Sequence, residues 1–223
     1  MSDIYVKSIE RIIIERERLE LSVQQLSDLV CVDQSNWCKI EQGKGRISYK
    51  CLKRLCSIKN IDMYYVLSGN RVAYCNYAEL TECDMSDLVS LLRLIYSVSE
   101  LRCRNASSNS WKDIYDNTKY ILLVDIQRGM NGLLVSLRRL GGYSQKKIAE
   151  ILGIDIKKWQ SMEKGVNFPD NELLCRLCDK FKISPGIMLG DKRCLLNEVC
   201  FWLEKMITLD NEAVVYMLNL IKK

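Results

Sequence analysis

Histidine is absent from the 223-residue chain. Its absence excludes Ser-His-Asp and Cys-His catalysis and every zinc site that needs an imidazole ligand. Only two prolines occur, glycine is sparse, and alternating β-branched residues are scarce, a pattern that favours helices over strands. No apolar run approaches the roughly 18 residues that a membrane span requires. We therefore expect an all-α protein that is neither an enzyme nor a partner of membranes.

The cysteines and the charge narrow the class further. Eleven cysteines occur, an odd number, and the first residues mix acidic and basic side chains, unlike a signal peptide. We expect a reducing compartment and a cytoplasmic protein. Cys175-x-x-Cys178 lies in a predicted helix and has no second pair at a suitable spacing, so we expect no metal and no other cofactor. The net charge of +5 permits a polyanionic partner without requiring one.

The chain repeats itself at a separation of 122 positions. Residues 12–67 match residues 134–189 without a gap, and apolar character is kept at the positions between the identities. Two copies are too few for a solenoid, so we infer a duplicated domain. The identical pairs include Arg16/Arg138, Ser22/Ser144, Asp33/Asp155, Trp37/Trp159, Glu41/Glu163, Gly43/Gly165, Leu52/Leu174, Arg54/Arg176 and Cys56/Cys178.

Each copy contains two short capped helices joined by a tight turn. Ser22 and Ser144 stand where a hydroxyl caps the first helix, and Asp33 and Asp155 stand where a carboxylate caps the second. The predicted first helices cover 23–30 and 145–152, and the second helices end at Glu41 and Glu163. Two short helices joined in this way are typical of a helix-turn-helix. Neither is long enough to persist alone, so both depend on packing.

These segments resemble the Cro and phage-repressor (XRE-type) family of helix-turn-helix proteins. The resemblance is carried by Ser22 to Lys44 and by Ser144 to Pro169, including the Glu-x-Gly after each second helix and the Phe-Pro of the second copy. It covers about 120 of the 223 residues. It implies two lambda-repressor-like domains, residues 1–69 and 131–223, joined by a helical spacer over 70–130. Proteins of this kind are prokaryotic or phage regulators that bind double-stranded DNA.

In this family the second helix lies in the major groove, so the resemblance also implies site residues. Gln34 can pair with adenine and Lys39 with guanine, whereas Ile156 can contact only a thymine methyl group. The residues implied to face bases are Gln34, Ser35, Lys39, Ile156, Lys157 and Ser161. Those implied to contact phosphates are Lys44, Arg46, Gln145, Lys146, Lys147, Lys158 and Lys164. Those assigned to the core or to helix caps are Ser22, Asp33, Trp37, Glu41, Ser144, Asp155, Trp159 and Glu163.

Positive charge is concentrated on the two copies. Residues 33–54 contain six basic and two acidic side chains, and residues 138–164 contain seven and three. This distribution favours a sequence-specific transcription regulator that binds DNA through phosphate and base contacts. The alternative is a protein-interaction module in which one or both units have lost base reading, and Ile156 favours it for the second unit.

The remaining segments carry further expectations. Cys31 replaces the turn glycine that the second copy keeps as Gly153, so we expect an altered turn in the first copy. Residues 84–103 and 111–126 predict a helical hairpin that separates the two units, either as a rigid spacer or as the interface of a homodimer. The tail from Cys194 predicts two amphipathic helices that complete the second domain's core, with Asp210 as a cap.

Overall fold

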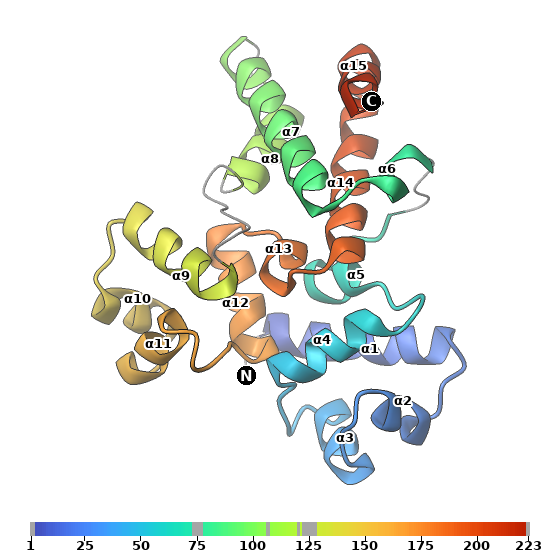
Figure 1. Ribbon diagram of the computed structural model, residues 1–223, viewed down its shortest axis with the longest axis vertical. Coiled ribbons are helices and arrows are strands. Elements are labelled where there is room, and N and C mark those ends of the chain that lie inside the picture. Colours follow the sequence, from blue (N-terminus) through green and yellow to red (C-terminus); the bar gives the residue numbers. More distant parts are fainter. Residues whose placement is uncertain (1–2, 73–77, 106–107, 120, 122–128, 222–223) are drawn as a thin grey trace.

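The protein is all-helical. The computed structural model describes residues 3–72, 78–105, 108–119, 121 and 129–221, which form fifteen helices and no strand (Figure 1). Within these ranges, every helix is too short or too polar to span a lipid bilayer. The expectation of an all-α fold is therefore confirmed.

The first repeat forms a five-helix unit. Its core is built from side chains that the sequence places at helical spacing, among them Leu26, Trp37 and Leu52, each with no exposed surface. Ser22 and Asp33 cap the two short helices as expected. The helices are α1 (Asp3–Arg18), α2 (Val23–Leu29), α3 (Gln34–Glu41), α4 (Tyr49–Ser57) and α5 (Met63–Ser68).

The second repeat forms a unit with the same helix order. Ile148, Trp159 and Leu174 occupy the same core positions and are equally buried. Ser144 and Asp155 again cap the short helices. The helices are α9 (Gly129–Leu140), α10 (Gln145–Leu152), α11 (Ile156–Glu163), α12 (Asn171–Phe181) and α13 (Pro185–Leu189).

The turn after α2 corrects one expectation. Cys31 adopts the left-handed conformation, with φ of 50°, and Gly153 has φ of 60°. The backbone amides of Cys31 and Val32 bond to the carbonyls of Asp28 and Ser27, and the equivalent bonds form around Gly153. The prediction of an altered turn was therefore wrong. The surrounding helices impose the glycine conformation on Cys31, at a cost of about 1 kcal/mol.

The two units pack directly against each other. α5 contacts α13, its own counterpart, and α1 contacts α12. The backbone amide of Ile47 donates to Asn171 Oδ1 at 3.0 Å. In return, the backbone amide of Asn171 donates to the Ile47 carbonyl at 3.0 Å. The rings of Tyr49 and Phe168 stack with centroids 4.9 Å apart. The prediction that the middle helices separate the units was therefore wrong, because the apolar faces of the two units cover each other.

The middle and the tail together form a third layer. It contains α6 (Ala78–Glu82), α7 (Met85–Asn105), α8 (Asn109–Thr118), α14 (Lys192–Ile207) and α15 (Asn211–Ile221). α7 and α8 form the expected hairpin, and the wide apolar face of α7 is covered by α8, α14 and α15. Asp210 accepts a bond from the Ala213 amide, as expected of a cap. The end of the predicted second hairpin helix, including Leu122, lies outside the described residues.

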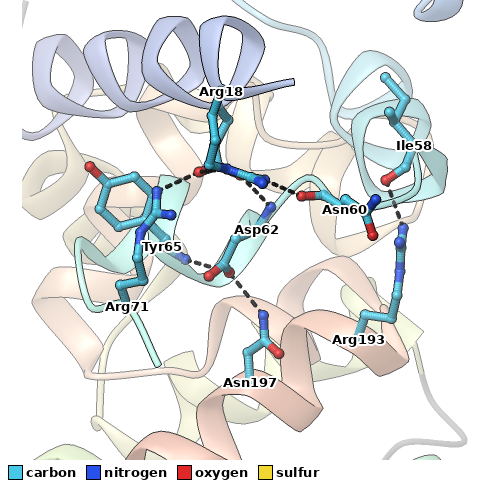
Figure 2. A network of polar contacts seen from close by, with 9 residues as sticks. Arg18, Ile58, Asn60, Asp62, Tyr65, Arg71, Arg193 and Asn197 are labelled. Atoms are coloured by element: carbon cyan, nitrogen blue, oxygen red, sulfur yellow. Dashed lines mark hydrogen bonds and ion pairs between the residues drawn. The ribbon is translucent and has the colours of Figure 1, made fainter. Parts of the chain in front are cut away.

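Helix α14 ties this layer to the first unit as well as to the second. Asn197 Nδ2 donates to Asp62 Oδ1 at 2.9 Å, and Arg193 donates to the carbonyl of Ile58 at 3.2 Å (Figure 2). Arg18 of α1 donates to the Asn60 carbonyl in the same network. The tail therefore does more than complete the core of the second domain, since it contacts α5 and α7 in addition to α13.

Candidate nucleic-acid interface

The short-helix pair of the first unit, α2 and α3, presents a polar edge to solvent. Asp33 Oδ1 accepts the amides of Ser35 and Asn36 and the Ser35 hydroxyl. The Ser35 hydroxyl and these amides hold the pKa of Asp33 below its ordinary value. Gln34, Ser35 and Lys39 are all exposed, and so is Asn36, which the resemblance did not single out. The exposed face of α3, from its first turn to Lys39 in its last, therefore offers amide, hydroxyl and ammonium groups to a partner.

A groove runs along one side of this edge. It has a volume of about 330 Å³ and lies between α3 and the loop that follows it. Asn36 and Lys39 line it from the helix, and Arg46 and Ser48 line it from the loop. The groove thus places polar and basic side chains on both of its walls.

An ion-paired network fixes each second short helix to the first helix of its unit. Arg16 Nε contacts Glu41 Oε1 at 2.9 Å, and Trp37 Nε1 donates to the same oxygen at 2.8 Å. Arg138, Glu163 and Trp159 repeat this arrangement in the second unit. Trp37 and Trp159 are fully buried, which confirms their assignment to packing. The sequence reasoning gave Arg16 and Arg138 no role, although their repetition at equal spacing was a signal for one.

Hydrogen bonds from the network set the charge of Glu163. Burial opposes ionisation of this carboxyl, but the bonds from Arg138, Gln145 and Trp159 outweigh burial and lower its pKa. The carboxylate therefore stays charged and orients α11 against α9 and α10.

The second short-helix pair, α10 and α11, differs at its polar edge. Ile156 and Lys157 are exposed, whereas Ser161 is half-buried and accepts a bond from Asn167 Nδ2 at 2.8 Å. Gln145 Nε2 donates to Glu163 Oε2 at 2.6 Å, and Gln145 Oε1 accepts from Gln160 at 3.1 Å. The Gln145 carboxamide is therefore already engaged, and a phosphate contact from it would have to replace one of these bonds.

The basic side chains expected to contact phosphates fall into two groups. Lys44, Lys146, Lys147 and Lys164 are exposed, and the contacts that Lys44 makes with Gln42 and that Lys147 makes with Glu150 are themselves on the surface. Contacts of this kind are weak and can be exchanged for a phosphate. These four side chains are therefore available to a polyanion.

Arg46, whose side chain is 53% exposed, and the half-buried Lys158 are instead ion-paired to carboxylates at the junction of the two units. Arg46 contacts Glu172 at 2.9 Å and Asp170 at 3.7 Å, and Lys158 contacts Asp170 at 3.2 Å. Asp170 also caps α12 through its other oxygen. Arg46 of the first unit therefore makes ion pairs that bridge the two units, whereas Lys158 pairs with Asp170 inside the second unit. The sequence predicted neither pairing.

Two other kinds of chemistry, metal binding and thiol reactivity, concern the cysteine and carboxylate side chains of the described residues. Among the residues that the structure describes, no group of three or more cysteine, aspartate or glutamate side chains could hold a metal ion. Cys175 lies on α12 and is buried in the core of the protein, where burial raises the pKa of its thiol to about 11. A comparison of the chain with protein-family models, curated proteins and solved structures found no match.

Proposed function

We propose that the chain binds double-stranded DNA with a sequence preference and acts as a transcription regulator. The observation that carries the proposal is the exposed polar edge of α3, held in a fixed orientation by the Asp33 cap and the Arg16–Glu41–Trp37 network. In the proposal, α2 and α3 form a helix-turn-helix, and the first turn of α3 enters the major groove. Gln34 then reads adenine and Lys39 reads guanine.

The arrangement of the molecule supports this orientation. In Figure 1, α3 and α11 lie on the periphery, away from the lobe formed by α7, α8 and α15. Lys44 lies in the loop after α3, Lys146 and Lys147 lie in the first turn of α10, and Lys164 is the C-cap residue of α11. We propose that these lysines contact phosphates on either side of the bases.

The second unit supports a narrower role. Its exposed turn carries Ile156 in place of Gln34, and Ser161 and Gln145 bond within the unit. We therefore propose that α3 reads sequence while α10 and α11 add phosphate contacts and avidity within one chain. The second candidate, a unit that binds protein rather than DNA, is favoured by the same three residues and applies to α10 and α11 alone.

The test is a fluorescence-anisotropy titration of the full chain against duplexes selected from a random pool, repeated at several salt concentrations. Lys44→Ala should weaken binding to all duplexes about equally and reduce the slope of log affinity against log salt by about one. Gln34→Ala should weaken the selected duplex by about tenfold and leave random duplex unchanged. Lys112→Ala, an exposed lysine on α8, is the matched control. The proposal would be contradicted if the affinity for DNA did not fall with salt and if neither Lys44→Ala nor Gln34→Ala changed it.

A further inference from the structure

A cavity lies where the two units meet α14. Its volume is about 280 Å³, near the lower end of the range in which proteins hold small ligands. α1 and α5 of the first unit, α12 of the second unit and α14 all contribute to its wall. The side chains that bear on its chemistry are Lys7, Arg11, Tyr64, Lys182, Glu198 and Trp202.

The inner wall carries a buried carboxyl group that no cation among the described residues pairs with. Glu198 is 6% exposed, and the only side chains that bond to or lower the pKa of its carboxyl are Ser184 and Trp202, within the described part of the chain. Burial raises the pKa of Glu198 to about 7. Buried carboxylates in proteins are normally paired with a cation or with several donors, and a carboxylate has more acceptor positions than the single bond from Ser184 fills. A ligand could therefore supply a further donor.

A buried donor stands beside this carboxyl group. Trp202 is 5% exposed, and its indole Nε1 has no partner in hydrogen-bonding geometry among the described residues. The Nε1–H lies close enough to the Glu198 carboxyl to lower its pKa, but no acceptor within the described residues stands in full hydrogen-bonding geometry to it. Glu198 and Trp202 are four residues apart on α14 and so share one helix face. The wall therefore offers an acceptor and a donor side by side.

The rim of the cavity is basic. Lys7 and Arg11 are one turn apart on α1, and Lys182 follows α12. Lys182 pairs with Asp179 at 3.2 Å on the surface, and Arg11 donates to the carbonyl of Val66 at 3.2 Å. Three cations against one exposed carboxylate leave the rim suited to an anionic group.

We propose that this cavity binds a mononucleotide, with the edge of the base on Glu198 and Trp202 and the phosphate on the basic rim. Nucleobases carry neighbouring hydrogen-bond donors and acceptors on one edge, which is the complement of a carboxylate beside an indole N–H. Because the wall is shared by both units and α14, the bound nucleotide stabilises their packing. This inference does not rest on DNA binding.

The test is isothermal titration calorimetry of the full chain with guanosine monophosphate and with adenosine monophosphate. The corresponding nucleosides and inorganic phosphate serve as the separate halves of each probe. At least one nucleotide should saturate at one molecule per chain and bind more tightly than its nucleoside. Trp202→Phe should weaken that nucleotide by about fivefold, the effect of one neutral hydrogen bond. Lys7→Ala should weaken the nucleotide by a similar factor and leave the nucleoside unchanged.

Lys180→Ala is the matched control, because this exposed lysine lies on α12 and does not line the cavity. Circular dichroism melts establish that each variant is folded. The proposal is overturned if binding of neither nucleotide saturates at millimolar concentration. It is also overturned if the Trp202→Phe and Lys7→Ala variants bind both nucleotides with the affinity of the unchanged chain. It is overturned as well if inorganic phosphate binds as tightly as the nucleotides, because the site would then recognise only an anion.

Discussion

The two repeats keep the same scaffold and differ in what that scaffold presents. Arg16, Trp37 and Glu41 have their exact counterparts in Arg138, Trp159 and Glu163, with the same bonds. An equivalent arginine in each unit also donates to the backbone carbonyl at the end of α2 or α10. Arg54 donates to the carbonyl of Val30, and Arg176 donates to that of Leu152. What the copies share is therefore the set of buried and capping contacts that fix the two short helices.

Several positions that differ between the repeats lie on or beside the polar edge. Where the second unit has Gln145, Gln160 and Asn167, which bond within the unit, the first unit has Val23, Cys38 and Gly45. The second unit thus satisfies its own polar groups, whereas the first leaves Gln34 and Lys39 exposed. A duplicated scaffold can carry two different surfaces because the core contacts and the surface groups occupy different faces of the same helices.

The largest expected effect concerns the shared network. Glu163→Ala removes the acceptor of Arg138 and Trp159, and the Glu163 side chain is only 6% exposed. Breaking a buried ion pair from one side leaves the other charge uncompensated, so we expect a loss of about 3 kcal/mol in the free energy of unfolding. Glu41→Ala should cost less, because Glu41 is 13% exposed. Urea denaturation followed by circular dichroism measures both.

The exposed Glu150 provides the control for this comparison. It pairs with Lys147 at 3.7 Å on the surface of α10, and Glu150→Ala should change stability by less than about 1 kcal/mol. Equal losses from Glu163→Ala and Glu150→Ala would show that the network does not hold the second unit together.

The next effect contrasts a paired carboxyl group with an unpaired one. The bonds to Glu163 outweigh its burial and lower its pKa, so its contribution to stability is present above pH 4.5 and is lost as the pH falls. Burial raises the pKa of Glu198 from 4.5 to about 7, so its contribution is present below pH 4.5 and is lost as the pH rises to about 7.

Glu198→Gln should therefore remove the decline in stability between pH 4.5 and 7. Above pH 7 the variant should be more stable than the unchanged chain by on the order of 3 kcal/mol. The glutamine keeps an acceptor for Ser184, so the substitution isolates the charge. Denaturation midpoints measured from pH 4 to 8 test this, and parallel curves for the two proteins would contradict it.

Local features of the fold were predictable from sequence, and contacts between distant segments were not. The caps at Ser144 and Asp155 predicted the starts of α10 and α11, because a cap depends on neighbours within one turn. The inward face of Trp159 followed from the family resemblance. The pairing of Arg46 with Glu172 joins residues in different repeats and leaves no periodic trace. The same holds for the packing of α5 on α13, which displaced the expected spacer.

The smallest effect isolates a single backbone difference between the repeats. Cys31 and Gly153 share a left-handed conformation and the same hydrogen bonds, so exchanging residue types there changes little except conformational strain. Cys31→Gly should raise the free energy of unfolding by up to about 1 kcal/mol, because it relieves the strain of an L-residue in the left-handed conformation. The greater freedom of glycine in the unfolded chain offsets part of this gain. Gly153→Ala should lower the free energy of unfolding by about the same amount through backbone strain alone. The added Cβ causes no clash, since it would lie 3.6 Å from Arg176 Nη1, an ordinary contact distance. Urea midpoints of both variants measure the pair. Shifts of the same sign would mean that the two turns, despite their matching bonds, are not held by the same forces.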